Sequence, residues 1–311
     1  MIEHIFDKSK IKRQLFYRIT DAEEGMSVRT FLKQHGYSRQ MIIDLKKTTF
    51  GIAVNEEWSY VRTILKKGDV LQITLEEEVG DGIVAKQSDF QILYEDADIL
   101  VVNKPSGMSI HPSQNHYDNT LANAVAFYMN QKNESITFRC INRLDRDTTG
   151  VTIIAKHRLA ASVLHKQNIE HRIKKIYLAV CEGKLFSEGT IDARIARREG
   201  STIERRIHED GEEAITHYKR LLYKKEEDIS LAEVRLETGR THQIRMHFQH
   251  IGHPLLGDFL YNPENRKMDR QGLHAYKISF FHPITTEYRT VTAPIPDDIR
   301  TLFSQELTEL F

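Results

Sequence analysis

The sequence predicts an α+β protein that consists of a small N-terminal αβ module and a larger, mainly antiparallel mixed-sheet domain. Strand-like and helix-like segments do not alternate strictly, which disfavours a doubly wound parallel sheet. The 311-residue chain is 40% hydrophobic and 28% charged, a composition typical of globular proteins. Its length is sufficient for a small module and a catalytic domain, each with its own core.

The first unit is expected over residues 17–77. Apolar residues recur every three or four positions within residues 28–32 and 41–45, as in two short amphipathic helices, and Ser38 is a suitable N-cap for the second. Residues 51–75 then alternate apolar and polar side chains around an Asn-Glu and a Lys-Gly-Asp turn signal. This pattern predicts a small sheet.

A linker is expected over residues 76–89, EEEVGDGIVAKQSD, because this run is acidic, contains glycine and is poor in large apolar residues. We therefore assign residues 1–80 to the N-terminal module and residues 81–311 to the larger domain.

The larger domain is expected to begin with two strands within residues 90–105, separated by an Asp-rich turn. A helix is expected over residues 119–132, with Asn119 as its cap. Further strands are expected at residues 151–156, 175–183, 229–239, 274–283 and 287–294, and further helices at residues 159–171 and 242–252.

The formal net charge is zero, so bulk charge does not identify a nucleic-acid-binding protein. An RNA site would have to be a local basic patch, although solvated faces of ordinary proteins look the same. The candidates are residues 194–206 and the cluster of Arg29, Lys33, Arg39, Lys46 and Lys47.

Cys140 and Cys181 are too few for a disulfide framework or a four-cysteine metal site. No segment reaches the roughly 18 apolar residues of a membrane span, and the first residues lack the apolar core of a signal peptide. We therefore expect a cytoplasmic protein without a membrane partner.

Charged residues crowd into one stretch, residues 141–157, INRLDRDTTGVTIIAKH. Arg143, Asp145, Arg146 and Asp147 surround Leu144 and directly precede an apolar strand. Charges beside a buried strand are costly unless they are paired, which favours a functional site supported by a core. From the residues alone, a solvated loop with a capping aspartate remains the alternative.

Residues 143–150, RLDRDTTG, are similar to the central signature of RluA-family pseudouridine synthases. NKPSGMSIHP at residues 103–112, KKIYLAVCEG at residues 174–183 and LETGRTHQIRMH at residues 236–247 resemble further motifs of that family in the same order. Asn142 departs from the pattern, which usually has histidine there. Asparagine can still donate and accept hydrogen bonds, so we expect activity to be retained.

The resemblance implies that the protein breaks the bond between ribose and uracil in RNA, rotates the base and rejoins it through carbon-5. It implies that Asp145 is the catalytic carboxylate, acting either on the anomeric carbon or on a sugar proton. It also implies that Arg143 occupies the space vacated by the flipped nucleotide. No cofactor and no metal are expected, in keeping with the absence of dinucleotide and P-loop fingerprints.

Three further residues receive roles from the resemblance. Arg245 is expected to pair with Asp145 and keep it ionised, with Arg240 as the second candidate. Tyr177 is expected to lie against the target base, although the residues alone indicate a half-exposed aromatic beside a sheet. Lys104 is expected to line the active-site floor and to bind substrate, or merely to end a strand.

The N-terminal unit resembles the alpha-L RNA-binding motif of a small-subunit ribosomal protein. This resemblance implies that Arg39, Lys46 and Lys47 contact phosphates from one basic helix, with support from Arg29 and Lys33. The expected partner is structured RNA, either large-subunit ribosomal RNA or transfer RNA, and a monomer is the default.

Two other functions are compatible with parts of the sequence. The chain could be a non-catalytic RNA-binding or ribosome-associated protein on the same fold, against which the presence of Asp145, Tyr177 and Arg245 argues. It could also be a glycoside hydrolase that uses Asp145 and Asp147. A sugar cleft needs exposed aromatics, however, and Trp58 is the only tryptophan.

A histidine-rich segment near residue 250 invites a metal-site interpretation. The spacing of these residues does not match an HExxH site, and they have no cysteine partner, so we expect no metal there. The histidines are His242, His247, His250 and His253.

Overall fold

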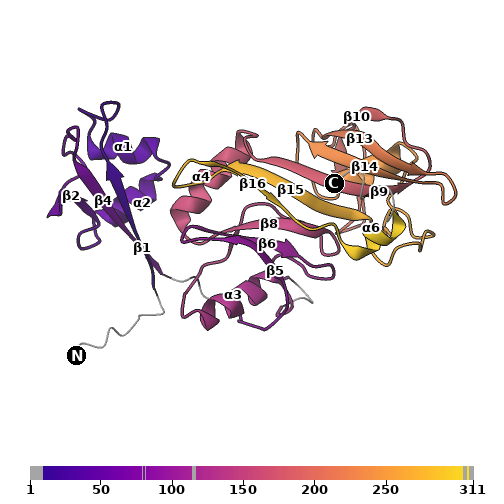
Figure 1. Cartoon of the computed structure of the whole chain (residues 1–311), viewed down its shortest axis with the longest axis horizontal. Coiled ribbons are helices and arrows are strands. Elements are labelled where there is room, and N and C mark those ends of the chain that lie inside the picture. The colour runs from indigo at the N-terminus through magenta and orange to yellow at the C-terminus, as the bar shows by residue number, and fades with distance from the viewer. Residues whose placement is uncertain (1–9, 79, 81, 114–116, 304–306, 308–311) are drawn as a thin grey trace.

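The computed structural model describes residues 10–78, 80, 82–113, 117–303 and 307. The strands form a four-stranded sheet in the N-terminal module, a ten-stranded sheet in the larger domain and a separate two-stranded hairpin. Helices pack against both main sheets (Figure 1). The predicted α+β class is therefore confirmed. None of the helices within these residues is long and apolar enough to cross a membrane.

The N-terminal module is an antiparallel sheet covered by two helices. Strand order is β1-β4-β2-β3, with β1 at Lys10–Arg18, β4 at Val70–Glu78, β2 at Ile52–Val54 and β3 at Glu57–Trp58. The helices are α1 at Val28–Gln34 and α2 at Arg39–Leu45. Ser38 accepts a hydrogen bond from the backbone N–H of Met41, so its predicted role as N-cap is confirmed. Strand β1 was not predicted, because exposed polar residues interrupt its short apolar run.

Two predicted boundaries in this module were wrong. Helix α2 ends at Leu45, so Lys46 is its C-cap and Lys47 lies beyond it, and the three basic residues do not share one helix. A turn follows the helix, in which the N–H groups of Lys47 and Thr48 both donate to the carbonyl of Asp44. Strand β4 continues to Glu78, so residues 76–78 belong to the sheet and not to a linker. The boundary between residues 80 and 81 stays a prediction, since residues 79 and 81 lie outside the described part.

The large sheet has the strand order β10-β13-β14-β9-β15-β8-β6-β5, with β16 paired to β15 and β7 to β8. Within the described ranges its strand pairs are antiparallel, except that β8 and β15 are parallel. The bounds are β5 Gln91–Glu95, β6 Ile99–Lys104, β7 Arg139–Cys140, β8 Thr149–Ala155, β9 Lys174–Glu182, β10 Glu188–Asp192, β13 Ile215–Lys224, β14 Ile229–Leu236, β15 Leu273–Phe281 and β16 Tyr288–Thr292. Strands β11, Ile195–Arg197, and β12, Arg205–Ile207, form the separate hairpin.

Alternating side chains of the strands decide which helix covers which face. Along β6, Leu100 and Val102 pack with helix α3, Leu121–Gln131, while Ile99 and Val101 pack with helix α4, Arg158–Ile169. Along β9, alternate residues that begin with Tyr177 pack with helix α5, Gln243–His250. The residues between them pack with helix α6, Asp297–Leu302. Tyr177 and α5 therefore share one face of the sheet.

The cap of α3 differs from the prediction. Thr120, not Asn119, is the N-cap, and its hydroxyl accepts from the backbone N–H of Asn123 while the Asn123 side chain returns to the Thr120 N–H. This reciprocal capping box satisfies two backbone donors. The predicted strands and helices of the larger domain are otherwise present, while β7, β10 to β13 and α6 were not predicted.

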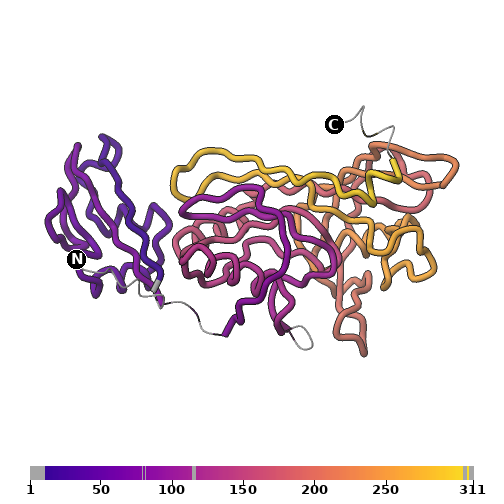
Figure 2. Tube along the Cα trace, turned by 60° about the horizontal axis from the view of Figure 1, so that its bottom comes forward, coloured from indigo at the N-terminus to yellow at the C-terminus, as the bar shows by residue number. Residues whose placement is uncertain are grey.

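The N-terminal module contacts helix α4 and the turn between strands β5 and β6 of the larger domain. Arg13 binds Asp98 through two nitrogens, at 2.7 and 3.3 Å. Arg158 donates to Asp44 at 2.5 Å, and Leu159 is buried in the core of the module. Figures 1 and 2 show the module at one end of the larger domain.

Candidate active site

The loop between β7 and β8 is fixed to β8 by Asn142. Its side-chain nitrogen donates to the carbonyl of Val151 at 2.8 Å, and its side-chain oxygen accepts from the N–H of Ile153 at 2.9 Å. Because the side chain is buried, both bonds are shielded from water. Asn142 therefore holds the beginning of the Arg143–Asp145 segment in register with the sheet.

Lys104 fixes the other end of the same loop. Its Nζ donates to the carbonyls of Pro105 at 2.7 Å, of Met108 at 2.8 Å and of Arg146 at 2.8 Å. The side chain is 0% exposed, and three carbonyls use the three donors of an ammonium. Lys104 therefore supports the loop from within, and its predicted contact with substrate stays a prediction.

Asp145 forms an ion pair with Arg245 across 100 residues of sequence, with 2.9 Å between Oδ2 and Nη1. The carboxylate is 26% exposed and the guanidinium only 2%. The carboxylate is thus partly open to solvent, whereas the guanidinium that it pairs with is buried. Asp145 remains accessible while its charge is compensated.

The bidentate partner of Arg245 is Asp258, not Asp145. Nε donates to Asp258 Oδ2 at 2.7 Å and Nη2 to Asp258 Oδ1 at 2.8 Å. Asp258 is fully buried and also accepts from the backbone N–H groups of Leu260 and Tyr261. Together the two carboxylates raise the pKa of Arg245 far above its ordinary value despite its burial.

The sequence analysis missed Asp258. The signal available in the sequence was an aspartate directly after a glycine, Gly257. In the structure Gly257 has a φ of +63°, which lies in the left-handed region that favours glycine. A Cβ at Gly257 would lie 2.3 Å from the carbonyl oxygen of Arg270. Only glycine therefore fits, and the turn directs Asp258 beneath Arg245.

Tyr177 lies on β9 within the same cluster as Leu144 and Ile244. It is 7% exposed, so it is more enclosed than the half-exposed aromatic of the residue-based interpretation. Burial, and then the negative charge of Asp145, raise the pKa of its hydroxyl above the ordinary value. Tyr177 is thus a neutral aromatic close enough to Asp145 to be affected by its charge.

Comparison with known proteins identifies the family of the chain. Residues 98–250 match the family model described as RNA pseudouridylate synthase. An uncharacterized RNA pseudouridine synthase of Bacillus subtilis, YhcT, is 38% identical over 93% of this chain and 96% of its own length. The chain belongs to the RNA pseudouridylate synthase family. The protein is a pseudouridine synthase, an isomerase that acts on RNA.

Further relatives of the synthase support the same assignment. Ribosomal large subunit pseudouridine synthase D of Xanthomonas campestris is 35% identical over 78% of this chain and 77% of its own length. The structure of human RNA Pseudouridylate Synthase Domain Containing 1 superposes with a TM-score of 0.57, at 28% identity, and covers 71% of this chain and 87% of that one.

Other predicted residues of the synthase fall into two groups. Arg143 is exposed and makes no ion pair or hydrogen bond with the residues that the structure describes, so its guanidinium is available to RNA. Arg240 instead binds Glu212 at 2.9 Å and the carbonyl of Glu213 at 3.0 Å, and so it does not pair with Asp145. Arg39, Lys46 and Lys47 are exposed on the N-terminal module.

The histidines of the α5 region do not converge on a common point. His247 lies between the Thr216 hydroxyl and the Ala193 carbonyl, and His253 contacts the Glu182 carbonyl. A separate group within 4.8 Å consists of Asp96, Asp98 and His282. These carboxylates already bind His282, His157 and Arg13. Their negative charges are therefore compensated without a metal cation.

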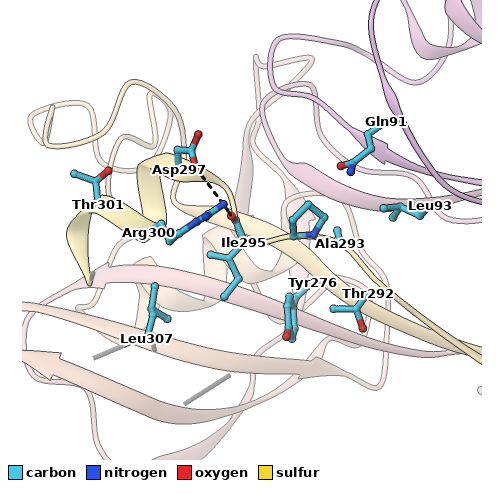
Figure 3. A pocket seen from close by; sticks show the side chains of 11 residues that line it. Gln91, Leu93, Tyr276, Thr292, Ala293, Ile295, Asp297, Arg300, Thr301 and Leu307 are labelled. Atoms are coloured by element: carbon cyan, nitrogen blue, oxygen red, sulfur yellow. Dashed lines mark hydrogen bonds and ion pairs between the residues drawn. The ribbon is translucent and has the colours of Figure 1, made fainter. Parts of the chain in front are cut away.

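The glycoside hydrolase alternative would use Asp147 as its second carboxylate, and a neighbouring arginine binds that side chain. Asp147 is bound by Arg146, with three nitrogen–oxygen contacts between 3.0 and 3.2 Å. A surface hollow of about 880 Å³ lies elsewhere, beside α6 and β16 (Figure 3). Its lining residues Ile295 and Leu307 pack on the face of β9 opposite Tyr177, so it is not part of the Asp145 site.

Proposed function

We propose that Asp145 is the catalytic carboxylate of the synthase and that its substrate is large-subunit ribosomal RNA. The observation that supports the catalytic role is the ion pair with Arg245, which binds only Oδ2 of Asp145. No hydrogen bond to Oδ1 comes from residues in the described ranges, so this oxygen can face a ribose. The ribosomal target is supported by the printed names of relatives such as ribosomal large subunit pseudouridine synthase D.

The isomerisation balances without an external reagent. The bond from the anomeric carbon to N1 of uracil breaks, a bond from that carbon to C5 forms, and the C5 proton leaves while N1 gains one. An ionised carboxylate at the sugar serves this reaction as nucleophile or as base. Arg245 compensates the charge of this carboxylate in a partly buried place, with 2.9 Å between Nη1 and Oδ2.

The residues around Asp145 have complementary roles in this proposal. Tyr177 packs against the flipped uracil and confines the detached base, since stacking of a base on an aromatic ring contributes about 1–3 kcal/mol. Arg143 fills the space that the flipped nucleotide leaves. Its exposure and its lack of a partner among the described residues support this role.

The N-terminal module serves as an RNA anchor in this proposal. Arg39, Lys46 and Lys47 are exposed and form no ion pair with described residues, so their charges are available to phosphates. We further propose that the protein acts as a monomer in the cytoplasm, which gel filtration of the purified protein and cell fractionation test.

The assay that tests the function uses radiolabelled uridine in RNA. Incubation with the protein should convert label into pseudouridine. Free uracil would indicate a glycosidase, and unchanged uridine a non-catalytic binding protein. Pseudouridine maps of ribosomal and transfer RNA, from cells with and without the protein, then identify the target. Loss of a modification confined to transfer RNA would contradict the ribosomal assignment.

A further inference from the structure

His242 lies beside Asp145, the carboxylate that we propose as catalytic. It is the N-cap residue of α5, with φ 58° and ψ 19°, in the left-handed region that residues other than glycine seldom adopt. Its side chain does not cap the helix. Nδ1 instead lies 2.9 Å from the Tyr261 hydroxyl, and Nε2 lies 3.8 Å from Asp145 Oδ2.

We infer that His242, oriented by Tyr261, is a positioning residue that directs an N–H at Asp145 and completes a hydrogen bond to it when uridine is bound. The inference rests on the proposed catalytic role of Asp145. The separation of 3.8 Å between Nε2 and Oδ2 is too long for a hydrogen bond in the free enzyme. Such contacts commonly shorten when substrate binds.

The hydroxyl of Tyr261 determines which nitrogen of His242 carries the proton. It accepts the backbone N–H of Arg205 at 2.9 Å, so its own proton is free for His242 Nδ1. Tyr261 is 7% exposed, and an unused donor there would be costly. When Nδ1 accepts, the proton of a neutral imidazole must reside on Nε2, the nitrogen that faces Asp145.

The surroundings favour the neutral form of the ring. Burial lowers the pKa of His242, Asp145 opposes this effect, and the positive charge of Arg245 adds to it; Arg205 and Asp258 are the other charged groups near the ring. The His242 ring meets Tyr261 edge to face, with 5.7 Å between centroids. The guanidinium of Arg245 lies 5.1 Å from the centroid of the same tyrosine. One aromatic residue therefore contacts both groups that face Asp145.

The contacts of Tyr261 continue to a basic surface hairpin. Arg205 is the first residue of β12, whose hairpin with β11 also carries Arg197, Arg198 and Arg206. The N–H that fixes the Tyr261 hydroxyl thus belongs to a segment suited to phosphate contacts. RNA that binds this hairpin would therefore also stabilise the contact of Tyr261 with His242, and through it the orientation of Asp145.

Tyr261→Phe is the decisive variant, because it keeps the ring and removes the hydroxyl. In metal sites, loss of the partner that orients a ligating side chain typically costs about 10–100-fold in affinity or activity, and we take the same scale here. We expect kcat to fall at least tenfold, while KM for RNA stays within about twofold. Tyr223→Phe is the matched control, since it removes a hydroxyl that binds exposed Asp228, outside the site. It should keep wild-type kcat.

His242→Asn separates the ring from the backbone conformation, because asparagine tolerates the left-handed region but is too short to reach Asp145. It should lower kcat as much as Tyr261→Phe or more, and the double variant should be no slower than His242→Asn alone. Multiplied effects, or a Tyr261→Phe enzyme with wild-type kcat, would overturn the inference.

Nitrogen-15 NMR of the His242 ring gives a readout independent of catalysis. We expect a neutral ring protonated on Nε2 in the wild type and a mixture of tautomers in Tyr261→Phe. A ring protonated on Nδ1 would overturn the inference even in an active enzyme. If the wild type forms no pseudouridine but shows the Nε2-protonated ring, the proposed function fails while the orientation of His242 stands.

Discussion

Arg245 binds two carboxylates at once, Asp258 through Nε and Nη2 and Asp145 through Nη1. The Asp258 pair is sealed from solvent, with exposed fractions of 2% for Arg245 and 0% for Asp258. The Asp145 carboxylate, which binds the same guanidinium, is 26% exposed. Asp258 therefore fixes the arginine, and the arginine fixes the carboxylate that we propose as catalytic.

Arg245→Leu should destabilise the fold as well as abolish activity. It leaves Asp258 as a buried, unpaired charge, a change that typically costs about 3–5 kcal/mol. Urea unfolding measures the loss in the free energy of unfolding. Arg240→Leu is the control and should cost less than about 1 kcal/mol, since its pair with Glu212 is exposed. Equal stability of the two variants would contradict the assigned role of the Asp258 pair.

Asp145→Asn should abolish pseudouridine formation and leave RNA affinity and folding nearly unchanged. The substitution is close in shape but removes the carboxylate that the chemistry requires. Single-turnover assays and RNA-binding titrations of the two proteins measure both effects. Turnover within tenfold of the wild type would assign the catalytic role to another residue.

Tyr177→Phe and Tyr177→Ala distinguish stacking from hydroxyl chemistry. Phenylalanine retains the ring that packs beside Leu144, whereas alanine removes it. We expect Tyr177→Phe to lose less activity than Tyr177→Ala, because the ring and not the hydroxyl contacts uracil. Thermal unfolding of both variants separates activity from the cost of a cavity. Equal activity losses with equal stability would instead give the hydroxyl a catalytic role.

Lys104 should make activity and stability respond to pH in opposite directions. Burial lowers its pKa from 10.5 to about 7, although Asp147 and Asp145 oppose the shift. The unfolded chain therefore binds more protons than the folded protein between these values, so the contribution of Lys104 to the free energy of unfolding rises with pH. The same deprotonation removes one of its three hydrogen bonds to loop carbonyls, and kcat should fall.

Urea unfolding and single-turnover rates between pH 6 and 10 measure both trends. Lys104→Met has no titrating group, so both trends should weaken in that variant. If the variant does not fold, the wild-type curves of stability and kcat against pH still test the prediction. A wild-type kcat that stays constant through pH 9 would show that the third hydrogen bond of Lys104 does not control the loop.

Replacement of Arg39, Lys46 and Lys47 by glutamine should weaken RNA binding and flatten its salt dependence. Loss of three phosphate contacts should reduce the slope of log affinity against log salt by about 2–3. Single-turnover chemistry at saturating RNA should persist, because the residues around Asp145 are unchanged. Arg18, Lys66 and Lys67, exposed elsewhere on the module, provide a control triple variant. Superimposable slopes for wild type and the first triple variant would exclude the module as an anchor.

The amino-acid sequence alone predicted many helices and strands and the family, because periodic apolar positions and short motifs depend on residues that are close in the chain. Periodic apolar positions predicted most helices and strands of the larger domain. Four motifs that resemble the family indicated its identity, and the last of them, residues 236–247, indicated Arg245 as the partner of Asp145. Strands such as β1 and β10 escaped prediction, because their stability comes from pairing with β4 and β13 and not from their own pattern.

Only the tertiary structure decided how the site is supported. The sequence marks Lys104, Asp258 and Tyr261 as polar side chains in loops or at strand ends, and such residues are exposed in most proteins. In the folded protein, Lys104 is buried and donates to three carbonyls. Asp258 binds Arg245, and the Tyr261 hydroxyl contacts His242. These contacts arise between loops that no periodic pattern relates, because the path of a loop depends on the elements that it connects.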